Sequence, residues 1–179
     1  MNSYDIPEVY KSLGITIPDL GCVMLDVEKI DVKPILPEEF GYTSPNWRYV
    51  KGLEAGDHIT LQFGLMQNAN TWREHVDAVL DGWTPGQPEI TYVSSFPAVN
   101  DEPYKCIVAN IYKAEWLLEA HERLSLLPHI DTHPGYKPHL TLAYVREEYE
   151  NIAIEMLARS VPTLLKATGI NYGRKPNNV

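Results

Sequence analysis

The chain has 179 residues, of which 44% are hydrophobic and 22% charged, a composition typical of a folded domain rather than of a disordered chain. At this length a single domain is expected. Fifteen Lys and Arg residues against 24 Asp and Glu residues give a net charge of −9 and a pI near 5.1, which argues against a protein that coats long nucleic acids, because such proteins neutralise phosphates with many cations.

Apolar periodicity and turn residues predict an order of strands and helices along the chain. Residues 1–20 are expected to be a peripheral lead-in with a short helix at Pro7–Ser12, and the proline-punctuated stretch up to Lys51 a loop that could cover a site. The tail, Asn171–Val179, is polar and expected to be loose. The predicted strands are Gly21–Lys29, His58–Phe63, Glu89–Val99, Tyr104–Lys113, His139–Val145 and Thr163–Ile170. The predicted helices are Asn70–Gly82, Ala114–Leu127 and Glu147–Arg159.

This order predicts an α+β fold, built mainly of antiparallel sheet, with residues 1–179 as one domain. The sequence contains no glycine-rich strand-to-helix turn and no Walker pattern. Cys22 and Cys106 belong to no CxxC pattern or dense disulfide framework, so they are expected to be buried thiols of a cytoplasmic protein. No apolar run approaches the length of a membrane span, and the N-terminus has no signal region, so no membrane association is expected.

One short repeat carries the chemistry: Asp57-His-Ile-Thr-Leu61 and Pro138-His-Leu-Thr-Leu142. Residues i and i+2 of a strand point to the same face, so each histidine is predicted to share a face with the threonine two residues on. The same alternation predicts a buried face that holds Ile59, Leu61 and Phe63 in the first copy and Leu140, Leu142 and Tyr144 in the second. Each copy is followed by a helical pattern, which indicates two similar halves that face each other across one cleft.

Two histidines at one cleft suit the cleavage of a phosphodiester by an internal hydroxyl group. A neutral histidine removes the proton of a ribose 2′-hydroxyl, and a protonated histidine supplies a proton to the leaving oxygen. Histidine suits both roles because its ordinary pKa is about 6.5. Threonine hydroxyls can donate to the non-bridging oxygens of the phosphate. These groups cover the whole reaction, so no metal or other cofactor is predicted; the sequence leaves open which histidine is the acid.

The paired motifs and the mass of 20.3 kDa resemble the two-histidine (2H) phosphoesterase superfamily, which includes the LigT-like RNA ligases and cyclic phosphodiesterases. The pattern of that superfamily is His-x-Thr/Ser-x in each half, with apolar residues at the x positions. The resemblance covers about residues 21–170 in architecture, and its specific part is the two tetrapeptides. It implies a bilobal α+β fold of two pseudo-twofold-related halves around a central cleft. It implies His58 and His139 as the catalytic pair and Thr60 and Thr141 as phosphate ligands.

Within this superfamily, Gly56–Leu65 and Tyr136–Val145 resemble most the phage enzymes that evade CBASS immunity by degrading cyclic di- and trinucleotides. The resemblance implies a small cyclic oligonucleotide, linearised in the host cytoplasm by attack of a 2′-hydroxyl on its own 3′–5′ linkage. The net charge of −9 fits such a ligand better than tRNA. Two alternatives stay open: a 2′,3′-cyclic phosphodiesterase or ligase-like enzyme that acts on RNA ends, and a protein that sequesters a nucleotide without cleaving it.

Three residues outside the motifs are predicted to contact substrate. Trp47 in the proline-rich loop and Tyr136 before the second motif are placed to stack on a base, a contact that contributes on the order of 1–3 kcal/mol. Lys137 is predicted to approach the substrate because it lies two residues before His139. For Arg48 and Lys51, a solvated surface position is the simpler interpretation.

The remaining histidines are interpreted as structural. His75 and His121 fall within predicted helices and belong to no partner motif. The run from His129 through Asp131 to His133 contains residue types that bind zinc, but it lies in a Pro/Gly loop without a cysteine pair, so no metal site is predicted. The absence of a GxSxG motif disfavours a serine hydrolase.

Overall fold

The protein is described by a computed structural model that covers residues 20–66, 71–98, 101–131 and 135–173. It is an α+β fold of two three-stranded antiparallel sheets with strand orders β2-β1-β6 and β3-β4-β5. The strands are β1 (Gly21–Val27), β2 (His58–Leu65), β3 (Ile90–Pro97), β4 (Tyr104–Ile111), β5 (His139–Arg146) and β6 (Ala167–Asn171). The helices are α2 (Arg73–Val79), α3 (Glu115–Leu124) and α4 (Glu150–Ser160), with two 3-10 turns, η1 (Glu38–Phe40) and η2 (Glu147–Tyr149).

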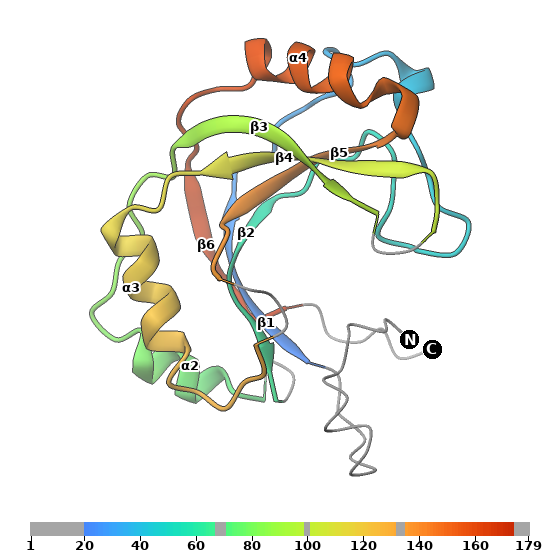
Figure 1. Cartoon of the computed structure of the whole chain (residues 1–179). Coiled ribbons are helices and arrows are strands. Elements are labelled where there is room, and N and C mark those ends of the chain that lie inside the picture. The colour runs from blue at the N-terminus through green and yellow to red at the C-terminus, as the bar shows by residue number, and fades with distance from the viewer. Residues whose placement is uncertain (1–19, 67–70, 99–100, 132–134, 174–179) are drawn as a thin grey trace.

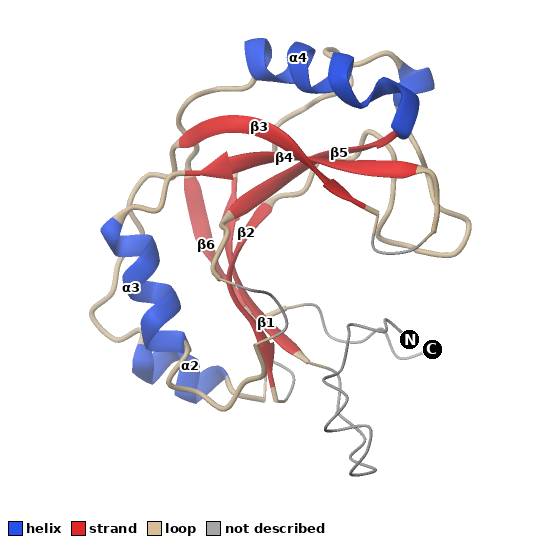
Figure 2. Ribbon diagram, viewed as in Figure 1, coloured by secondary structure: helices blue, strands red, loops and turns tan. Residues whose placement is uncertain are grey.

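Helices cover one face of each sheet (Figures 1 and 2). Helix α4 lies over β3, β4 and β5, whereas α2 and α3 lie together on the side of the other sheet, where α3 packs against β2. In α3, the buried residues Leu117, Ala120 and Leu124 recur at spacings of three and four, which places them on one face of the helix. The opposite sheet faces, called the inner faces below, are left for the site.

Within the described residues, every predicted strand and helix is present, and the ends of most of them differ from the prediction by one to a few residues. The helix predicted from Asn70, a position outside the described residues, to Gly82 is observed as Arg73–Val79, and the helix predicted from Glu147 opens with the 3-10 turn η2. The last strand begins at Ala167 rather than Thr163, because the backbone of residues 163–165 bonds to the start of β3 instead. The helix predicted at Pro7–Ser12 and residues 174–179 of the predicted tail lie outside the described residues.

The two sheets meet at their edge strands β2 and β5. The edge of each strand that has no partner strand in its own sheet is covered by a segment from the other half. The loop before β2 pairs with β5, and the segment before β5 pairs with β2. The backbone hydrogen bonds of this reciprocal edge pairing are Tyr42 N to Tyr144 O (2.9 Å), Tyr144 N to Gly52 O (2.8 Å), Met66 N to Pro128 O (3.0 Å) and Ile130 N to Gly64 O (2.8 Å).

Glycine is required where the second of these segments crosses β2. Gly64 has a backbone φ of +92°, a conformation that residues other than glycine rarely adopt. A Cβ at this position would overlap the carbonyl oxygen of Ile130. The edge of β2 can therefore be covered so closely only because residue 64 has no side chain.

A hydrophobic cluster of described residues extends through both halves. Ile59 and Leu61 of β2 and Leu140 and Leu142 of β5 are fully buried in it, as predicted. Full burial of one such side chain contributes roughly 1.5–3 kcal/mol, so these residues fix which face of each strand carries the histidines. Among the helices of the described ranges, none has the length and apolar content needed to cross a membrane.

Candidate active site

The two His-x-Thr motifs occupy corresponding positions at the start of β2 and β5. In both strands the histidine and threonine are half-buried, whereas the apolar residues between and after them are fully buried. The sequence of buried and half-buried residues is the same in the two strands over their first seven positions. The predicted pairing of His58 with Thr60 and of His139 with Thr141 on shared faces is therefore confirmed.

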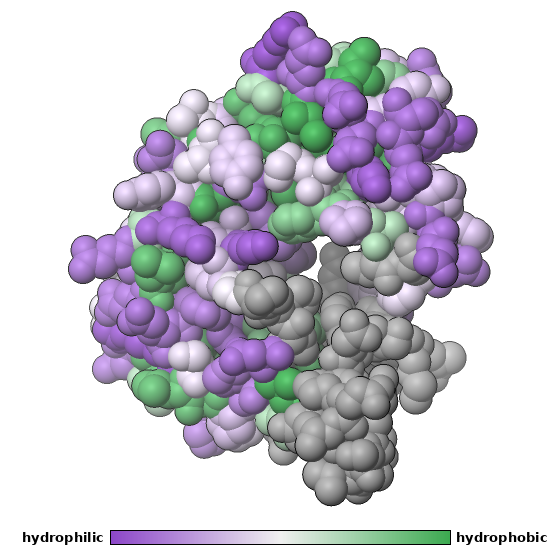
Figure 3. Space-filling model, viewed as in Figure 1, coloured by the Kyte–Doolittle hydropathy of each residue, from purple (hydrophilic) through white to green (hydrophobic). Residues whose placement is uncertain are grey.

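Hydrogen bonds join each motif directly to the segment that precedes the other. The Gly56 amide donates to the Thr141 carbonyl oxygen at 2.8 Å. The Tyr136 hydroxyl donates to the Thr60 carbonyl oxygen at 2.9 Å. Because both bonds end on a motif threonine, they hold the two motifs at a fixed separation. In the space-filling view, the surface is hollowed near its centre, beside the half formed by β3, β4 and β5 (Figure 3).

Each motif histidine has its Nδ1 against a hydrogen-bond acceptor. In His139 this acceptor is the Lys137 carbonyl oxygen at 2.8 Å, and in His58 it is the Asp57 carboxylate at 3.3 Å. A neutral ring so placed carries its proton on Nδ1 and its basic lone pair on Nε2. The Phe96 and His139 rings also form a T-shaped pair, with centroids 4.8 Å apart and planes at 87°, a favourable aromatic geometry.

A β-bulge follows each motif, and it places two aromatic residues on the face opposite to the one predicted from the sequence. Strict alternation placed Phe63 and Tyr144 on the core face, which is wrong. Both are half-buried, and their cross-strand partners are Cys22 and Cys106. In each sheet the register shifts just beyond the motif threonine, because an extra residue is inserted there and later side chains change face. Phe63 and Tyr144 therefore lie on the inner faces with the motifs.

The strands that pair with β2 and β5 carry a second repeat, which the sequence analysis missed. Cys22-x-x-x-Asp26 in β1 corresponds to Cys106-x-x-x-Asn110 in β4, with the acid opposite His58 and the amide opposite His139. The third strand of each sheet supplies a partner, since Asn171 donates to Asp26 Oδ1 at 3.1 Å and Asn110 donates to Ser94 Oγ at 2.7 Å. The equal spacing in two predicted strands was a signal that could have revealed this repeat.

Both cysteines are free thiols, half-buried rather than fully buried, and each contacts a motif threonine. Cys22 Sγ lies 3.9 Å from Thr60 Oγ1, and Cys106 Sγ lies 3.9 Å from Thr141 Oγ1. Burial raises the pKa of each thiol to about 11, and the hydrogen bond to threonine opposes part of this rise. The thiols are therefore protonated at neutral pH.

Of the three predicted substrate contacts, Tyr136 and Lys137 lie beside the motifs. One face of the Tyr136 ring is stacked on His121, with centroids 4.0 Å apart and planes at 6°, and burial raises the pKa of its hydroxyl. His121 in turn donates from Nδ1 to the Leu61 carbonyl oxygen at 2.8 Å, which agrees with a structural role. The Lys137 side chain is exposed. Base stacking by Tyr136 stays a prediction, and it would use the ring face opposite His121.

Trp47 lies in the loop that pairs with the far end of β5, near Tyr144 rather than at the start of the strand. Its indole is half-buried, and its amide donates to Ser44 Oγ at 2.9 Å. Glu102, from the turn between β3 and β4, fixes this loop. Its carboxylate accepts hydrogen bonds from Ser44 Oγ (2.8 Å), Asn46 Nδ2 (3.0 Å) and the Tyr42 hydroxyl (3.3 Å).

The remaining candidate ligands form no metal centre within the described ranges, where no group of three or more His, Cys, Asp or Glu residues is placed to hold an ion. His129 donates from Nδ1 to the Leu127 carbonyl oxygen at 2.8 Å, and its Nε2 lies 3.3 Å from Asp131. His133 lies outside the described residues. His75 is exposed and packs edge-on against Trp72.

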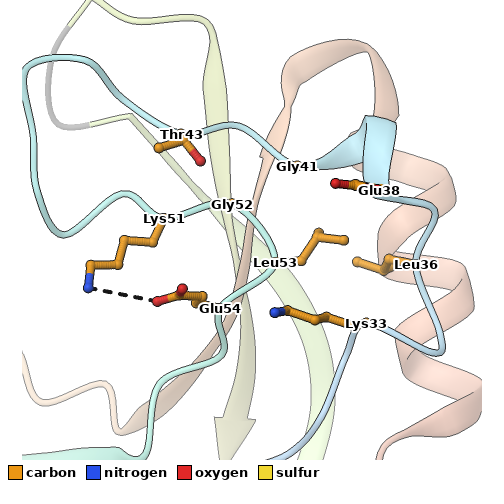
Figure 4. A pocket seen from close by; sticks show the side chains of 9 residues that line it. All are labelled: Lys33, Leu36, Glu38, Gly41, Thr43, Lys51, Gly52, Leu53 and Glu54. Carbon is orange, nitrogen blue, oxygen red and sulfur yellow. Dashed lines mark ion pairs between the residues drawn. The ribbon is translucent and has the colours of Figure 1, made fainter.

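A cavity of about 500 Å³ lies between the loop before β2 and the segment that leads into η1 (Figure 4). Lys33, Thr43, Lys51 and Glu54 line it, and the Lys51 ammonium lies 3.7 Å from the Glu54 carboxylate. The motif histidines and threonines are not among its lining residues. Lys51 is exposed, in agreement with the solvated position favoured from the sequence, and it is paired with a carboxylate.

No family model matches the chain, and no curated protein matches it. Among solved structures, the chain is similar to Usb1 of Kluyveromyces marxianus at 8% sequence identity and a TM-score of 0.48. That alignment covers 80% of this chain and 84% of the other.

Proposed function

We propose that the chain is a metal-independent phosphodiesterase of the two-histidine superfamily that cleaves 3′–5′ linkages in small cyclic oligonucleotides. The observation that carries this proposal is the duplicated arrangement of the site: two His-x-Thr motifs on adjoining edge strands, each with the histidine Nδ1 against an acceptor. Two such histidines supply one proton acceptor and one proton donor at Nε2, which is what internal cleavage of a phosphodiester needs.

In the proposed reaction, the neutral histidine takes the proton of a ribose 2′-hydroxyl through Nε2. The 2′-oxygen then attacks the adjacent phosphorus, and the bond from phosphorus to the 5′-oxygen of the next nucleotide breaks. The protonated histidine gives its proton to that leaving oxygen. The products are a 2′,3′-cyclic phosphate and a 5′-hydroxyl on one linear molecule. The hydroxyls of Thr60 and Thr141 donate to the two non-bridging oxygens, where negative charge builds in the transition state.

The choice of cyclic oligonucleotides follows the sequence resemblance to phage enzymes that evade CBASS immunity, and it is supported by charge. With a net charge of −9, the chain favours a compact ligand that binds through local donors over a long RNA backbone. A phage-encoded enzyme of this kind would act in the host cytoplasm. The alternatives are cleavage of 2′,3′-cyclic phosphates or RNA ends by the same residues, and sequestration of a nucleotide without cleavage.

The deciding experiment is incubation of the full chain, in EDTA, with a panel of cyclic dinucleotides, cyclic trinucleotides, a linear RNA and a 2′,3′-cyclic mononucleotide, with products read by mass spectrometry. We expect linear products from the cyclic substrates, and none from His58→Ala or His139→Ala. His75→Ala is the matched control, since His75 is exposed and lies on α2, away from both motifs, and it should cleave as the wild type does.

Each other outcome selects a different function. Cleavage confined to the linear RNA or the 2′,3′-cyclic nucleotide would replace the proposed substrate with RNA ends. Quantitative recovery of intact ligand after denaturation of a complex would indicate sequestration. Cleavage of a cyclic dinucleotide whose 2′-hydroxyls are replaced by hydrogen would contradict the internal mechanism, because no nucleophile would remain on the substrate.

A further inference from the structure

The two thiols on the inner faces take no part in the reaction described above, although each contacts a threonine that does. The contact occurs once in each half, at the same Sγ to Oγ1 distance of 3.9 Å. Each thiol comes from the strand that pairs with the motif strand, so the motif itself does not dictate the contact. Its recurrence at equivalent places in both halves points to a shared role.

The hydrogen-bonding capacities of the two groups suggest that role. A threonine hydroxyl has one hydrogen to donate and two acceptor sites, and its hydrogen rotates to suit its surroundings. Cys22 Sγ donates to Thr60 Oγ1, and the same direction is open to Cys106 and Thr141. Burial keeps both thiols protonated, because it raises their pKa to about 11. A thiol that fills an acceptor site on the oxygen directs the hydroxyl hydrogen away from itself.

We propose that Cys22 and Cys106 are positioning residues, each of which donates its S–H to the neighbouring motif threonine and so aims that threonine's O–H at the phosphate. The inference rests on the proposed function, since it assigns a role within the same site. No bond to sulfur forms or breaks, and the thiols stay protonated throughout. Hydrogen-bond donors that are oriented before the reaction stabilise the developing charge without a free-energy cost of reorientation.

A thiol that only fills space would behave differently in one measurable respect. Its removal would lower the rate by the same factor whether or not the threonine hydroxyl is present. A thiol that acts through the hydroxyl has no effect once that hydroxyl is gone. Non-additivity between neighbouring substitutions therefore separates the two roles.

The test is a double-mutant cycle on kcat with Cys22→Ala, Thr60→Val and the double variant, measured on the panel member that the wild type cleaves fastest. We expect Cys22→Ala to lower kcat about threefold to tenfold with little change in KM, the size expected for one net hydrogen bond. On the Thr60→Val background it should have no further effect. Cys22→Ser retains a donor and should recover part of the loss.

The chain offers a matched control in its other half. Combining Cys22→Ala with Thr141→Val joins a thiol and a hydroxyl that do not contact each other, so their effects on kcat should multiply. Cys106 is tested in the same way, with Thr141 as partner and Thr60 as control. If an alanine variant fails to fold, as judged by near-ultraviolet circular dichroism, a valine variant at the same position, which also lacks a hydrogen-bond donor, replaces it in the cycle.

Two results would overturn the assignment of the thiols while leaving the enzyme intact: kcat unchanged in both alanine variants, or equal losses with and without the threonine hydroxyl. A wild-type chain that cleaves no member of the panel would overturn the proposed function and the thiol role together. The failure of one proposal is therefore distinguishable from the failure of both.

Discussion

The backbone of Gly56 lies directly against Thr141, the threonine of the opposite motif. A Cβ on residue 56 would lie 3.3 Å from the Thr141 carbonyl oxygen, closer than a Cβ usually packs, and 3.5 Å from the Thr141 Cβ, an ordinary contact distance. Gly56 lies two residues before His58, so the first motif begins directly after this contact with β5. The glycine thus sets the spacing between the two motifs.

Gly56→Ala should therefore reduce activity more than stability. The added methyl group forces a shift of a few tenths of an ångström between the motifs, and a misplacement of about 1 Å can cost about a hundredfold in rate. We expect kcat to fall about tenfold. Gly169→Ala in β6 is the control, because a Cβ there meets nothing within 4 Å. An unchanged kcat in Gly56→Ala would show that the spacing is not critical.

Glu102→Gln should raise KM by loosening the loop that carries Trp47. The carboxylate accepts three hydrogen bonds from this loop, and an amide in its place offers only one acceptor oxygen. We expect KM to rise about threefold to tenfold, with kcat little changed. If Trp47 contacts substrate, Trp47→Ala should change KM in the same direction. Wild-type KM values in both variants would remove Trp47 from the substrate contacts.

Alkaline pH should destabilise the fold through Cys22 and Cys106. Their pKa values are raised in the folded state, from 9.0 to about 11, so their contribution is fully present below pH 9 and is lost as pH rises toward 11. Two pKa units correspond to at most about 2–3 kcal/mol for each thiol. Urea unfolding at pH 7.5, 9, 10 and 11 measures this loss. The loss of unfolding free energy should be smaller in a Cys22→Ala/Cys106→Ala variant. An equal loss would show that the two thiols do not cause the alkaline destabilisation.

Tyr136→Phe separates the two roles of Tyr136. The substitution removes the hydrogen bond to the Thr60 carbonyl oxygen and keeps the ring stacked on His121. We expect the free energy of unfolding to fall by about 1 kcal/mol, because the carbonyl loses its partner. If the ring also stacks on a base, KM should stay near the wild-type value in Tyr136→Phe and rise in Tyr136→Leu. Equal KM values in the two variants would exclude base stacking.

The sequence predicted the strands of the site well because their patterns are local. Alternation assigned the faces of His58, Thr60, His139 and Thr141 correctly. It failed three residues after each motif threonine, at Phe63 and Tyr144, because a bulge inserts a residue and alternation assumes that none is inserted. A bulge is a property of two paired strands, and a single strand read alone does not reveal it.

The second repeat was missed for a different reason. Cys22 and Asp26 are four residues apart, as are Cys106 and Asn110, and neither pair is a known motif by itself. Their importance comes from the register that places Asp26 opposite His58 and Asn110 opposite His139. Register across a sheet depends on which strands pair, which the sequence analysis left unassigned.

The reciprocal edge pairing has a mechanical consequence. The loop before the first motif is bonded to the strand of the second motif, and the segment before the second motif is bonded to the strand of the first. Rotating one half away from the other would break backbone hydrogen bonds on both sides at once, so the pairing opposes a hinge motion between the described parts of the two halves. Relative rotation of the two halves is therefore opposed by the same hydrogen bonds that hold the two motifs beside each other.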